Sequence, residues 1–520
     1  MDKYDVIVIG SGIGGLSCAS HISKYSDKKV LILEQNNVIG GLTSGFHRKG
    51  YYFEAGTLGI NLIDMFKALL YDIDPVLPDE VHRQFYKYVI CDKVCDGKNT
   101  KEIEDQYVKM FPENEKEVRR FFKFINKGAK IIKEFFSVFD HYKYFKSGFF
   151  KKALTMLKLT PVIVKNAWFF IFYYPKQLNT VLLEYFGSIK TNPGYYFANM
   201  SYYYNPPFFM FVGMWFEYVR GLGGAKNGYL EMAEKIAKVA TDNGVTLLKK
   251  QKVNKIIIEN GKAIGVETDT DKFYAEHIVS NIDLKKLILT MCPDFTFRKS
   301  LQKRLSEAQP SESGLILYLG VKMTNDEVKK YIPETEMLYV NKDFKPVNDI
   351  YDYMKICSLQ VSPSYYLTGD RVKDGCTSII VHVSIPPELH SPWWDLKKDE
   401  YKETKRILKD ILVDRMETLI PGITSKIEVI DLATPKTLEN WVNCTGGASS
   451  GFSWDRKKSF MKALSLTKVF LQTPVKNLYQ VGMFSFQAGG GVYGSSLSGR
   501  LGAELICGKK FNSYINVEKK

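Results

Sequence analysis

The stretch that decides the fold runs from residue 5 to residue 15 and reads Asp5-Val6-Ile7-Val8-Ile9-Gly10-Ser11-Gly12-Ile13-Gly14-Gly15. Its apolar first half predicts a buried strand, and its glycines match the pattern G-x-G-x-x-G that leads from a strand into a helix. The first glycine permits the tight turn, the second lets the backbone approach a pyrophosphate, and the third lets helix pack against strand. A helix N-terminus attracts phosphate. We therefore predict a dinucleotide site formed by Gly10, Gly12, Ile13, Gly14 and Gly15.

The residues that follow complete a βαβ unit. A helix is predicted over 12–24 and a second strand over 29–34, and this strand ends on Glu34, 24 residues after Gly10. An acid at that place accepts hydrogen bonds from ribose hydroxyls and repels a 2′-phosphate. The unit predicts an α/β fold with a parallel sheet.

Further glycines follow the second strand. Gly40-Gly41 comes six residues after Glu34, and Phe53-Glu54-Ala55-Gly56 comes next. With these motifs the chain resembles the family that includes phytoene desaturases, carotenoid cis–trans isomerases and retinol saturases, a branch near the monoamine oxidases. The resemblance implies FAD as cofactor, with Glu34, Gly40 and Gly41 at its ribose and pyrophosphate. Leu42 stands where the wider amine-oxidase group often has Arg, which weakens an amine-oxidase interpretation.

Two later regions also resemble this family. Residues 220–228 are rich in glycine and are expected to open a helix that leads to a strand around Val253, whose backbone would meet the adenine. The C-terminal segment has a strand over 478–481 that ends on Gly482, followed by the glycine-rich residues 489–494 and a last helix over about 495–506. The resemblance implies that Gly482, Gly491 and Val492 lie at the flavin. Met483 replaces the acid usual after the glycine, so no role is assigned there.

The predicted fold class is α/β, with a Rossmann-like FAD-binding domain interleaved with a mixed α+β substrate domain that carries a helical cap. The FAD-binding domain would consist of residues 1–70, 221–290 and 465–520, and the substrate domain of residues 71–220 and 291–464. The pattern from about 62 to 190 is largely helical. Short strands are predicted over 245–248, 252–259, 263–268, 273–280, 314–323 and 378–385, and helices over 229–243 and 401–419.

Composition limits the classes of protein. Among the 520 residues, 45 % are hydrophobic and 25 % charged, which excludes a disordered or collagen-like chain. The net charge is 72 − 57 = +15. Residues 131–220 contain 28 aromatic side chains, and residues 141–183 contain seven Lys and no Asp or Glu. These aromatics could fill the core of a cap, line an apolar tunnel, or meet an anionic membrane together with the lysines. No nucleic-acid-binding motif accompanies the charge, so nucleic acid is not expected as a partner.

Other kinds of active site leave no signature. The eight Cys and seven His show no metal-ligand spacing, so we expect no metal site and reduced thiols. A strand that begins near Asp5 leaves no room for a signal peptide, and no apolar stretch reaches the ~18 residues of a membrane span. We expect a cytoplasmic protein with peripheral membrane contact. The catalytic residues are unassigned: Tyr493 is a candidate for shaping the pocket, with core packing as its alternative, and Glu217 and His390 are weaker acid–base candidates.

The resemblance implies an FAD-dependent oxidoreductase, either a desaturase, a saturase or a cis–trans isomerase, that acts on carbon–carbon double bonds of a long apolar polyene such as a carotenoid or retinoid. The alternatives are a fatty-acid double-bond reductase or isomerase, an FAD amine oxidase, and a lipid-binding protein with a relic dinucleotide fold. The glycines at 221–224 follow no convincing strand, so a second nucleotide site is not expected. The sequence indicates no oligomeric state.

Overall fold

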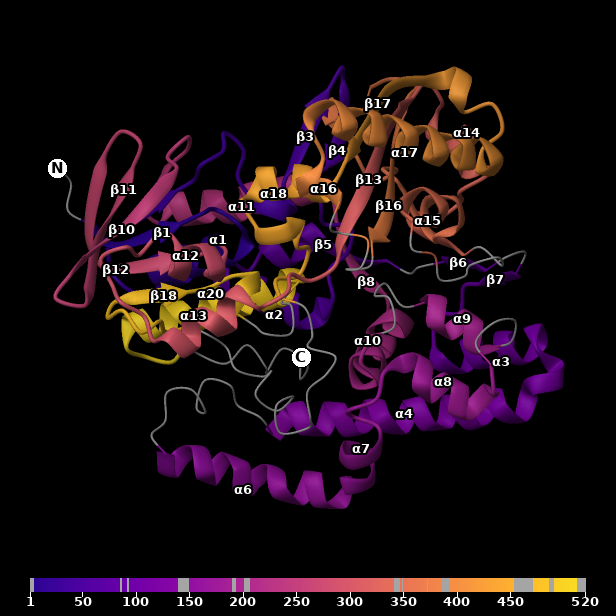
Figure 1. Cartoon of the computed structure of the whole chain (residues 1–520), viewed down its shortest axis with the longest axis horizontal. Coiled ribbons are helices and arrows are strands. Elements are labelled where there is room, and N and C mark those ends of the chain that lie inside the picture. Colours follow the sequence, from indigo (N-terminus) through magenta and orange to yellow (C-terminus); the bar gives the residue numbers. More distant parts are fainter. Residues whose placement is uncertain are drawn as a thin grey trace.

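The predicted N-terminal strand lies in the middle of a parallel sheet (Figure 1). The computed structural model describes residues 4–84, 87–90, 93–138, 149–188, 193–200, 206–340, 347, 349–371, 373–385, 389, 392–452, 471–485 and 491–511. Within them, this first sheet consists of β1 (Tyr4–Ile9), β2 (Val30–Leu33), β9 (Thr246–Leu248), β10 (Val253–Glu259), β11 (Lys262–Thr268), β12 (Lys272–Ser280) and β18 (Leu478–Gln480). The strands β18-β12-β1-β2-β9 are parallel neighbours, and the hairpin β10–β11 adds to β12 in antiparallel fashion.

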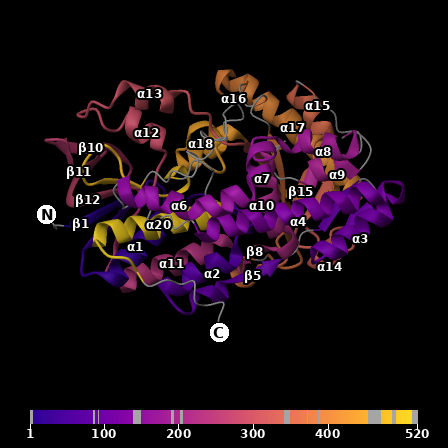
Figure 2. The same ribbon diagram turned by 90° about the horizontal axis from the view of Figure 1, so that it is seen from below.

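Alternate residues of β1 pack on opposite sides of the first sheet. Val6 and Val8 belong to a core shared with helices of one face, and Ile7 and Ile9 belong to a core shared with the β10–β11 hairpin and helices of the other. The first face is covered by α1 (Ile13–Tyr25), α2 (Ile63–Ile73), α11 (Tyr229–Asp242) and α20 (Gly491–Cys507), which Figure 2 shows from below. The second is covered by α12 (Leu284–Leu289) and α13 (Lys299–Ser306). The three-layer arrangement explains why the last four residues of β1, 6–9, are all apolar and buried.

A second sheet lies beside the first (Figure 1). In the described part of the chain its order is β17 (Ile427–Ala433), β13 (Ser313–Val321), β16 (Thr377–Ile385), β15 (Leu359–Pro363), β14 (Met337–Val340), β6 (Lys87–Ile90) and β7 (Lys93–Cys95). All nine residues of β13 are buried. Its odd-numbered residues pack under α15 (Ile350–Ile356) and α17 (Lys398–Leu419), which leaves even-numbered residues such as Ile316 on the face toward the first sheet.

A helical region beside the second sheet has an aromatic core. It comprises α3 (Thr100–Met110), α4 (Glu115–Val138), α6 (Phe149–Lys165), α7 (Ala167–Phe172), α8 (Leu178–Phe186), α9 (Pro193–Met200) and α10 (Phe208–Arg220). Phe121, Phe122, Phe197 and Trp215 are fully buried there and make edge-to-face contacts. Core packing is thus the role of these four aromatic side chains.

The region that the sequence predicts as largely helical, 62–190, is interrupted by strands. It contains β5 (Val81–Gln84), β6 and β7 in addition to its helices. Of the glycine-rich residues 221–224, the last three lie in a strand, β8 (Leu222–Ala225), which pairs with β5. The region 62–190 is nevertheless largely helical, and the helix expected after residues 220–228 is α11. The short strands were not predicted, because β5, β6 and β8 find their partners far away in the sequence, where no local pattern reveals them.

The remaining elements are the hairpin β3 (Gly45–Arg48) and β4 (Tyr51–Glu54), and the helices α14 (Asn325–Lys329), α16 (Pro392–Asp395) and α18 (Pro435–Val442). Within the described residues, no helix is long and apolar enough to cross a bilayer. The division into an FAD-binding and a substrate domain at residues 70, 220, 290 and 464 stays a prediction, and its last boundary lies outside the described residues.

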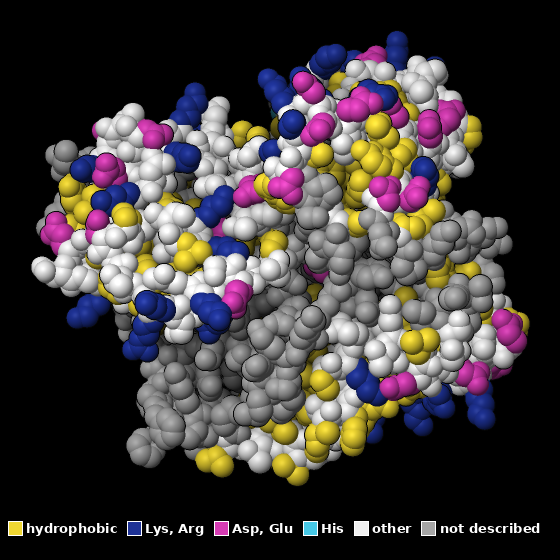
Figure 3. All heavy atoms as spheres, viewed as in Figure 1, with side chains coloured by type: hydrophobic (Ala, Val, Ile, Leu, Met, Phe, Trp, Pro, Cys, Tyr) yellow, Lys and Arg dark blue, Asp and Glu magenta, His cyan; other side chains and the backbone are white. Residues whose placement is uncertain are grey.

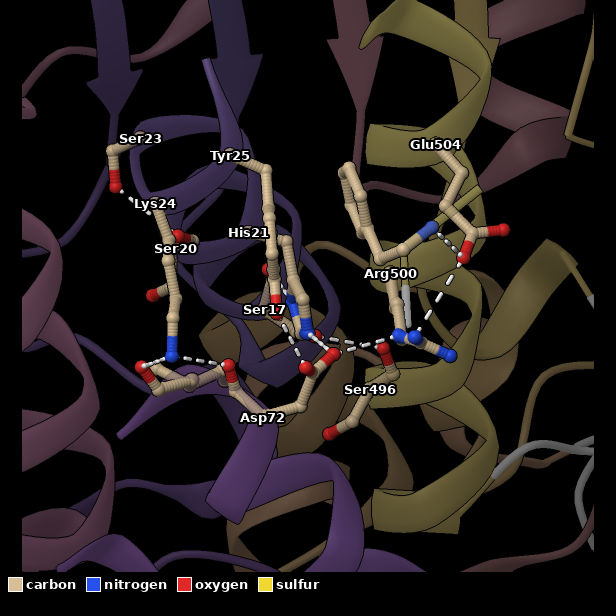
Figure 4. A network of polar contacts seen from close by, with 12 residues as sticks. Ser17, Ser20, His21, Ser23, Lys24, Tyr25, Asp72, Ser496, Arg500 and Glu504 are labelled. Atoms are coloured by element: carbon tan, nitrogen blue, oxygen red, sulfur yellow. Dashed lines mark hydrogen bonds and ion pairs between the residues drawn. The ribbon is translucent and has the colours of Figure 1, made fainter. Parts of the chain in front are cut away.

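A buried polar network joins α1, α2 and α20 at the C-terminal end of α1 (Figure 4). The carboxylate of Asp72 accepts hydrogen bonds from His21 Nε2 (3.2 Å), the Tyr25 hydroxyl (2.6 Å) and Arg500 Nε (2.9 Å). Burial alone would raise the pKa of Asp72, but the hydrogen bonds from His21 and Tyr25 and the charges of His21 and Arg500 lower it to about 2. Asp72 is therefore ionised at neutral pH and holds three helices together.

Candidate functional site

The turn between β1 and α1 has the geometry that its glycines predict. Gly10 has a φ of +91°, which favours glycine. A Cβ on Gly15 would lie 2.2 Å from the carbonyl oxygen of Gly10, and a Cβ on Gly14 would lie 2.7 Å from the Cα of Gly482. In the described part of the chain, no side chain caps the N-terminus of α1. The first N–H groups of α1 therefore remain available to an anion at this turn.

Glu34 closes the far side of this turn. It follows β2, is buried, and accepts hydrogen bonds from the backbone N–H of Ser11 (2.9 Å), the Ser11 hydroxyl (2.6 Å) and the N–H of Asn36 (2.8 Å). The Gly40 N–H donates to the Ser11 carbonyl oxygen, and a Cβ on Gly41 would lie 3.4 Å from the Cα of Gly12. The two glycine-rich segments, 30 residues apart, thus form one continuous wall.

A cavity of about 270 Å³ opens on this wall. It extends from Glu34 and Val253 past the start of α1 to Ile316 on the second sheet. The sequence-predicted site residues that line it are Gly10, Gly12, Ile13, Gly14, Glu34, Gly40, Gly41, Val253, Gly491 and Val492. The structure thus brings together residues from four separate parts of the sequence.

Three predicted residues do not line the cavity. Gly15 packs against the end of β1, and Gly482, with a φ of +86°, packs against the side chain of Asn281. Tyr493 is buried in the core beneath the first sheet, the position that its core-packing alternative describes. Its role at the pocket stays a prediction. His390, the side chain of Glu217, and Gly489 and Gly490 lie outside the described residues.

Asn281 is a cavity residue that the sequence prediction missed. It follows β12, and its Nδ2 donates to the carbonyl oxygen of Gly10 at 3.3 Å. A Cβ on Gly12 would lie 2.8 Å from the same Nδ2. Asn281 therefore fills the space that the glycines leave, and its position directly after the strand predicted over 273–280 was the signal that could have revealed it.

The second sheet contributes two further cavity residues that sequence reasoning missed. Gln360 on β15 and His382 on β16 are opposite each other in the strand register, and both line the cavity. Burial lowers the pKa of His382 to about 4, so its imidazole is neutral at physiological pH. No local pattern marks these residues, because their position depends on the pairing of distant strands.

The lining is suited to an extended dinucleotide. Among the described residues that line the cavity there is no Lys or Arg, and the acids are Glu34 and Asp283. Asp283 already accepts hydrogen bonds from the N–H groups of Lys285 and Thr445. Phosphates would thus be held by the backbone at the start of α1, a ribose by Glu34, and the ring system between α20 and the second sheet. The residues present fit FAD.

The comparisons with known proteins agree with this arrangement. The chain is 24 % identical to an all-trans-retinol 13,14-reductase of Danio rerio, over 98 % of this chain and 86 % of that protein. It is 26 % identical to a chloroplastic prolycopene isomerase of Daucus carota, over 100 % of this chain and 81 % of that protein. A solved structure of a putrescine oxidase bound to putrescine has the same fold, with a TM-score of 0.64 at 12 % identity, covering 98 % of this chain and 100 % of that one.

These findings confirm the predicted fold class, the resemblance to flavoproteins of the carotenoid and retinol type, and FAD as the cofactor. The family model that matches is described as flavin containing amine oxidoreductase, and it covers residues 13–507. The chain therefore belongs to this family and is an FAD-dependent oxidoreductase.

Proposed function

We propose that this enzyme acts on carbon–carbon double bonds of a long apolar polyene, as a desaturase, a saturase or a cis–trans isomerase. The observation that carries the proposal is the continuity of one cavity from the glycine-rich wall to the second sheet. The names of the relatives support it, because one reduces retinol and another isomerises prolycopene. Apolar side chains at the second-sheet end, among them Ile316 and Leu438, suit an apolar substrate.

The chain's own residues would position cofactor and substrate. Gly10, Gly12, Ile13, Gly14, Gly15, Glu34, Gly40, Gly41, Val253, Gly482, Gly491 and Val492 are the residues proposed to hold FAD. Bound FAD supplies the exchange of hydride or electrons. The side chains of Ile316, Leu438 and Val492 would exclude water from the substrate. His382 is neutral and buried beside them and could hold a proton at either ring nitrogen.

The test begins with a visible spectrum of the purified protein and identification of the extracted cofactor. The FAD-loaded protein is then mixed anaerobically with phytoene, lycopene isomers, retinol and linoleate, while the redox state of the flavin and the products are followed. We expect reaction with a polyene. Reaction with linoleate alone would favour the fatty-acid alternative, and peroxide release with amines alone would favour an amine oxidase. A protein that stays colourless after reconstitution would support the lipid-binding alternative.

We further propose that this protein is cytoplasmic and docks on anionic membranes. Large apolar side chains are exposed on α6 and α7: Leu157 (65 % exposed), Val164 (67 %), Ile171 (62 %) and Phe172 (60 %). Figure 3 shows hydrophobic side chains along this lower edge of the molecule. We call these four residues the docking surface. Exposed apolar groups of this size, in a part of the sequence with seven Lys and no acid, suit the interface of an anionic bilayer.

Sedimentation with vesicles tests this docking surface. We expect binding to vesicles that contain anionic lipid, weakened by salt and by the double change Ile171→Glu and Phe172→Glu. The matched control is Val76→Glu, because Val76 is 66 % exposed but lies outside the docking surface. Equal binding by all three proteins would contradict this location of the interface. Four of the seven lysines, at positions 143, 146, 151 and 152, have side chains outside the described residues.

A further inference from the structure

A row of three side chains crosses the second sheet where it borders the cavity. Ile316 on β13 lies opposite His382 on β16, and His382 lies opposite Gln360 on β15. Directly opposed residues of neighbouring strands point to the same face of a sheet. All three residues line the cavity. The wall that faces the proposed substrate therefore carries two polar groups beside an apolar one.

The amide of Gln360 has a fixed orientation. Its Nε2 donates a hydrogen bond to Oε1 of Glu336, a residue only 1 % exposed. Because the amide nitrogen of Gln360 faces Glu336 in this hydrogen bond, the amide oxygen faces away from Glu336.

The oxygen of Gln360 lacks a hydrogen-bond donor. Gln360 is 6 % exposed, and its Oε1 has no hydrogen-bond partner within the described residues. Buried acceptors without a donor are rare, since they lose their bonds to water and gain none in return. In a residue that lines a cavity, such an atom is satisfied most directly by a donor on the molecule that the cavity takes up.

The charge of the surroundings limits which donor fits. His382 is neutral at physiological pH, and no Lys or Arg is found among the described residues of the lining. A buried wall of uncharged side chains disfavours an ammonium group, which loses its hydration on entry. A hydroxyl group donates one hydrogen bond and carries no charge, so it matches this wall.

We propose that Gln360 makes this enzyme select, among long apolar polyenes, those that carry a hydroxyl group. The hydroxyl group would donate a hydrogen bond to Gln360 Oε1. Gln360 is then a specificity-determining residue. The inference rests on the proposed function, because it names the class of polyene that the same cavity takes.

The experiment compares a polyene alcohol with the hydrocarbon of the same length and conjugation. Binding to the FAD-loaded protein is measured by the change in flavin absorption under anaerobic conditions without turnover. We expect the wild-type protein to bind the alcohol about tenfold more tightly than the hydrocarbon. Gln360→Met, which keeps the length of the side chain but removes the acceptor, should abolish this preference and leave the affinity for the hydrocarbon within about twofold.

Ser362→Ala is the matched control. Ser362 is two residues further along β15, is 8 % exposed, and its hydroxyl also lacks a hydrogen-bond partner in the described part of the chain, but it does not line the cavity. The Ser362→Ala variant should therefore keep the preference for the alcohol. The bound FAD per mole of protein should be equal in all three proteins.

The outcomes separate this inference from the proposed function. Equal affinity of the wild-type protein for alcohol and hydrocarbon would overturn the role of Gln360 and leave the polyene function intact. A matched amine that binds more tightly than the alcohol, or loss of FAD in Gln360→Met alone, would also overturn it, because the oxygen would then serve another group. If the FAD-loaded wild-type protein binds no polyene, the proposed function fails and this inference fails with it.

Discussion

Helix α1 is attached to α20 in different ways at its two ends. Near its N-terminus the helices touch through backbone, and a Cβ on Gly499 would lie only 2.2 Å from the carbonyl oxygen of Gly14. Near its C-terminus the contact is made by polar side chains, with the carboxylate of Asp72 between His21 and Arg500 (Figure 4). The two helices are thus joined by close backbone packing at one end and by a buried carboxylate and guanidinium at the other.

The two ends of α1 have different roles: one contributes to the cavity, and the other to stability. At the glycine end, close packing brings the start of α1 to the cavity and leaves its N–H groups available to phosphate. At the charged end, the ion pairs are buried away from the cavity and hold helices together. We therefore expect changes at the glycine end to affect both FAD content and stability, and changes at the charged end to affect stability alone.

The largest effect is expected for Gly499→Val. The new side chain would meet the Gly14 carbonyl oxygen and the Cys18 N–H group, and neither backbone can move without displacing α1. We expect the free energy of unfolding to fall by on the order of 5 kcal/mol, with loss of bound FAD. Urea unfolding and the flavin absorbance per mole of protein measure the two effects.

The control for this variant is Gly213→Ala. A Cβ on Gly213 would have no atom of the described residues within 4 Å, and Gly213 lies inside α10. Alanine favours a helix over glycine by up to about 1 kcal/mol, so this variant should be as stable as the wild-type protein or slightly more stable. A Gly499→Val variant that binds FAD normally would contradict the role assigned to the glycine end.

The second effect is expected for Asp72→Asn. The change keeps the shape but leaves Arg500 and His21 without their buried carboxylate, so the free energy of unfolding should fall by about 4 kcal/mol. Bound FAD in the folded fraction should be unchanged. Because the pKa of Asp72 is lowered from 3.8 to about 2, its stabilising contribution is present above pH 3.8 and is lost as the pH falls through about 2.

The control for Asp72→Asn is Asp242→Asn. Asp242 pairs with Lys238 on the surface of α11, where both side chains are more than half exposed. Exposed pairs of this kind contribute less than about 1 kcal/mol. A similar fall in the free energy of unfolding in the two variants would show that burial does not strengthen the Asp72 network.

The two ends of α1 also differ in how far the sequence predicts them. The local sequence predicts the turn from Gly10 to Gly15, the following helix and Glu34, because each of them lies directly beside a predicted strand. The partners of Asp72 are not all local: Arg500 is 428 residues away, although it lies in the last helix that the sequence predicts. Such a pair becomes visible only when α2 and α20 are placed in the fold.

The two ends of the cavity also differ in how well the sequence predicts them, again because one end depends on distant strand pairing. The glycine-rich wall was predicted residue by residue, apart from Asn281. Gln360 and His382 were missed because β15 and β16 meet only through the register of the second sheet. Strands β5 to β7 were missed because they are three or four residues long. In addition, β5 and β6 pair with segments more than 100 residues away, and β7 pairs with β6.

The smallest effect concerns a second buried carboxyl group, which lacks the ion pairs of Asp72. Glu54 accepts hydrogen bonds from the Tyr229 N–H (3.0 Å) and from the hydroxyls of Tyr52 (3.1 Å) and Tyr366 (3.3 Å). Burial raises the pKa of Glu54 to about 7, even though these hydrogen bonds and the charge of Arg371 act in the opposite direction. Glu54 accepts its hydrogen bonds from a backbone N–H and two hydroxyls, whereas Asp72 also accepts them from the side chains of Arg500 and His21 and is slightly less buried.

Glu54→Gln tests this contrast. In the folded protein Glu54 keeps its proton up to about pH 7, whereas in the unfolded chain it loses it above about pH 4.5. Its contribution to stability is therefore full below pH 4.5 and is lost as the pH rises through 7, by about 3 kcal/mol in total. Gln is uncharged over this range and can keep the hydrogen bond from the Tyr229 N–H. Urea unfolding of both proteins across this range measures the effect. The free energy of unfolding of the wild-type protein should fall relative to that of Glu54→Gln as the pH rises. A constant difference between the two proteins would mean that Glu54 is ionised in the folded protein and stabilised as Asp72 is.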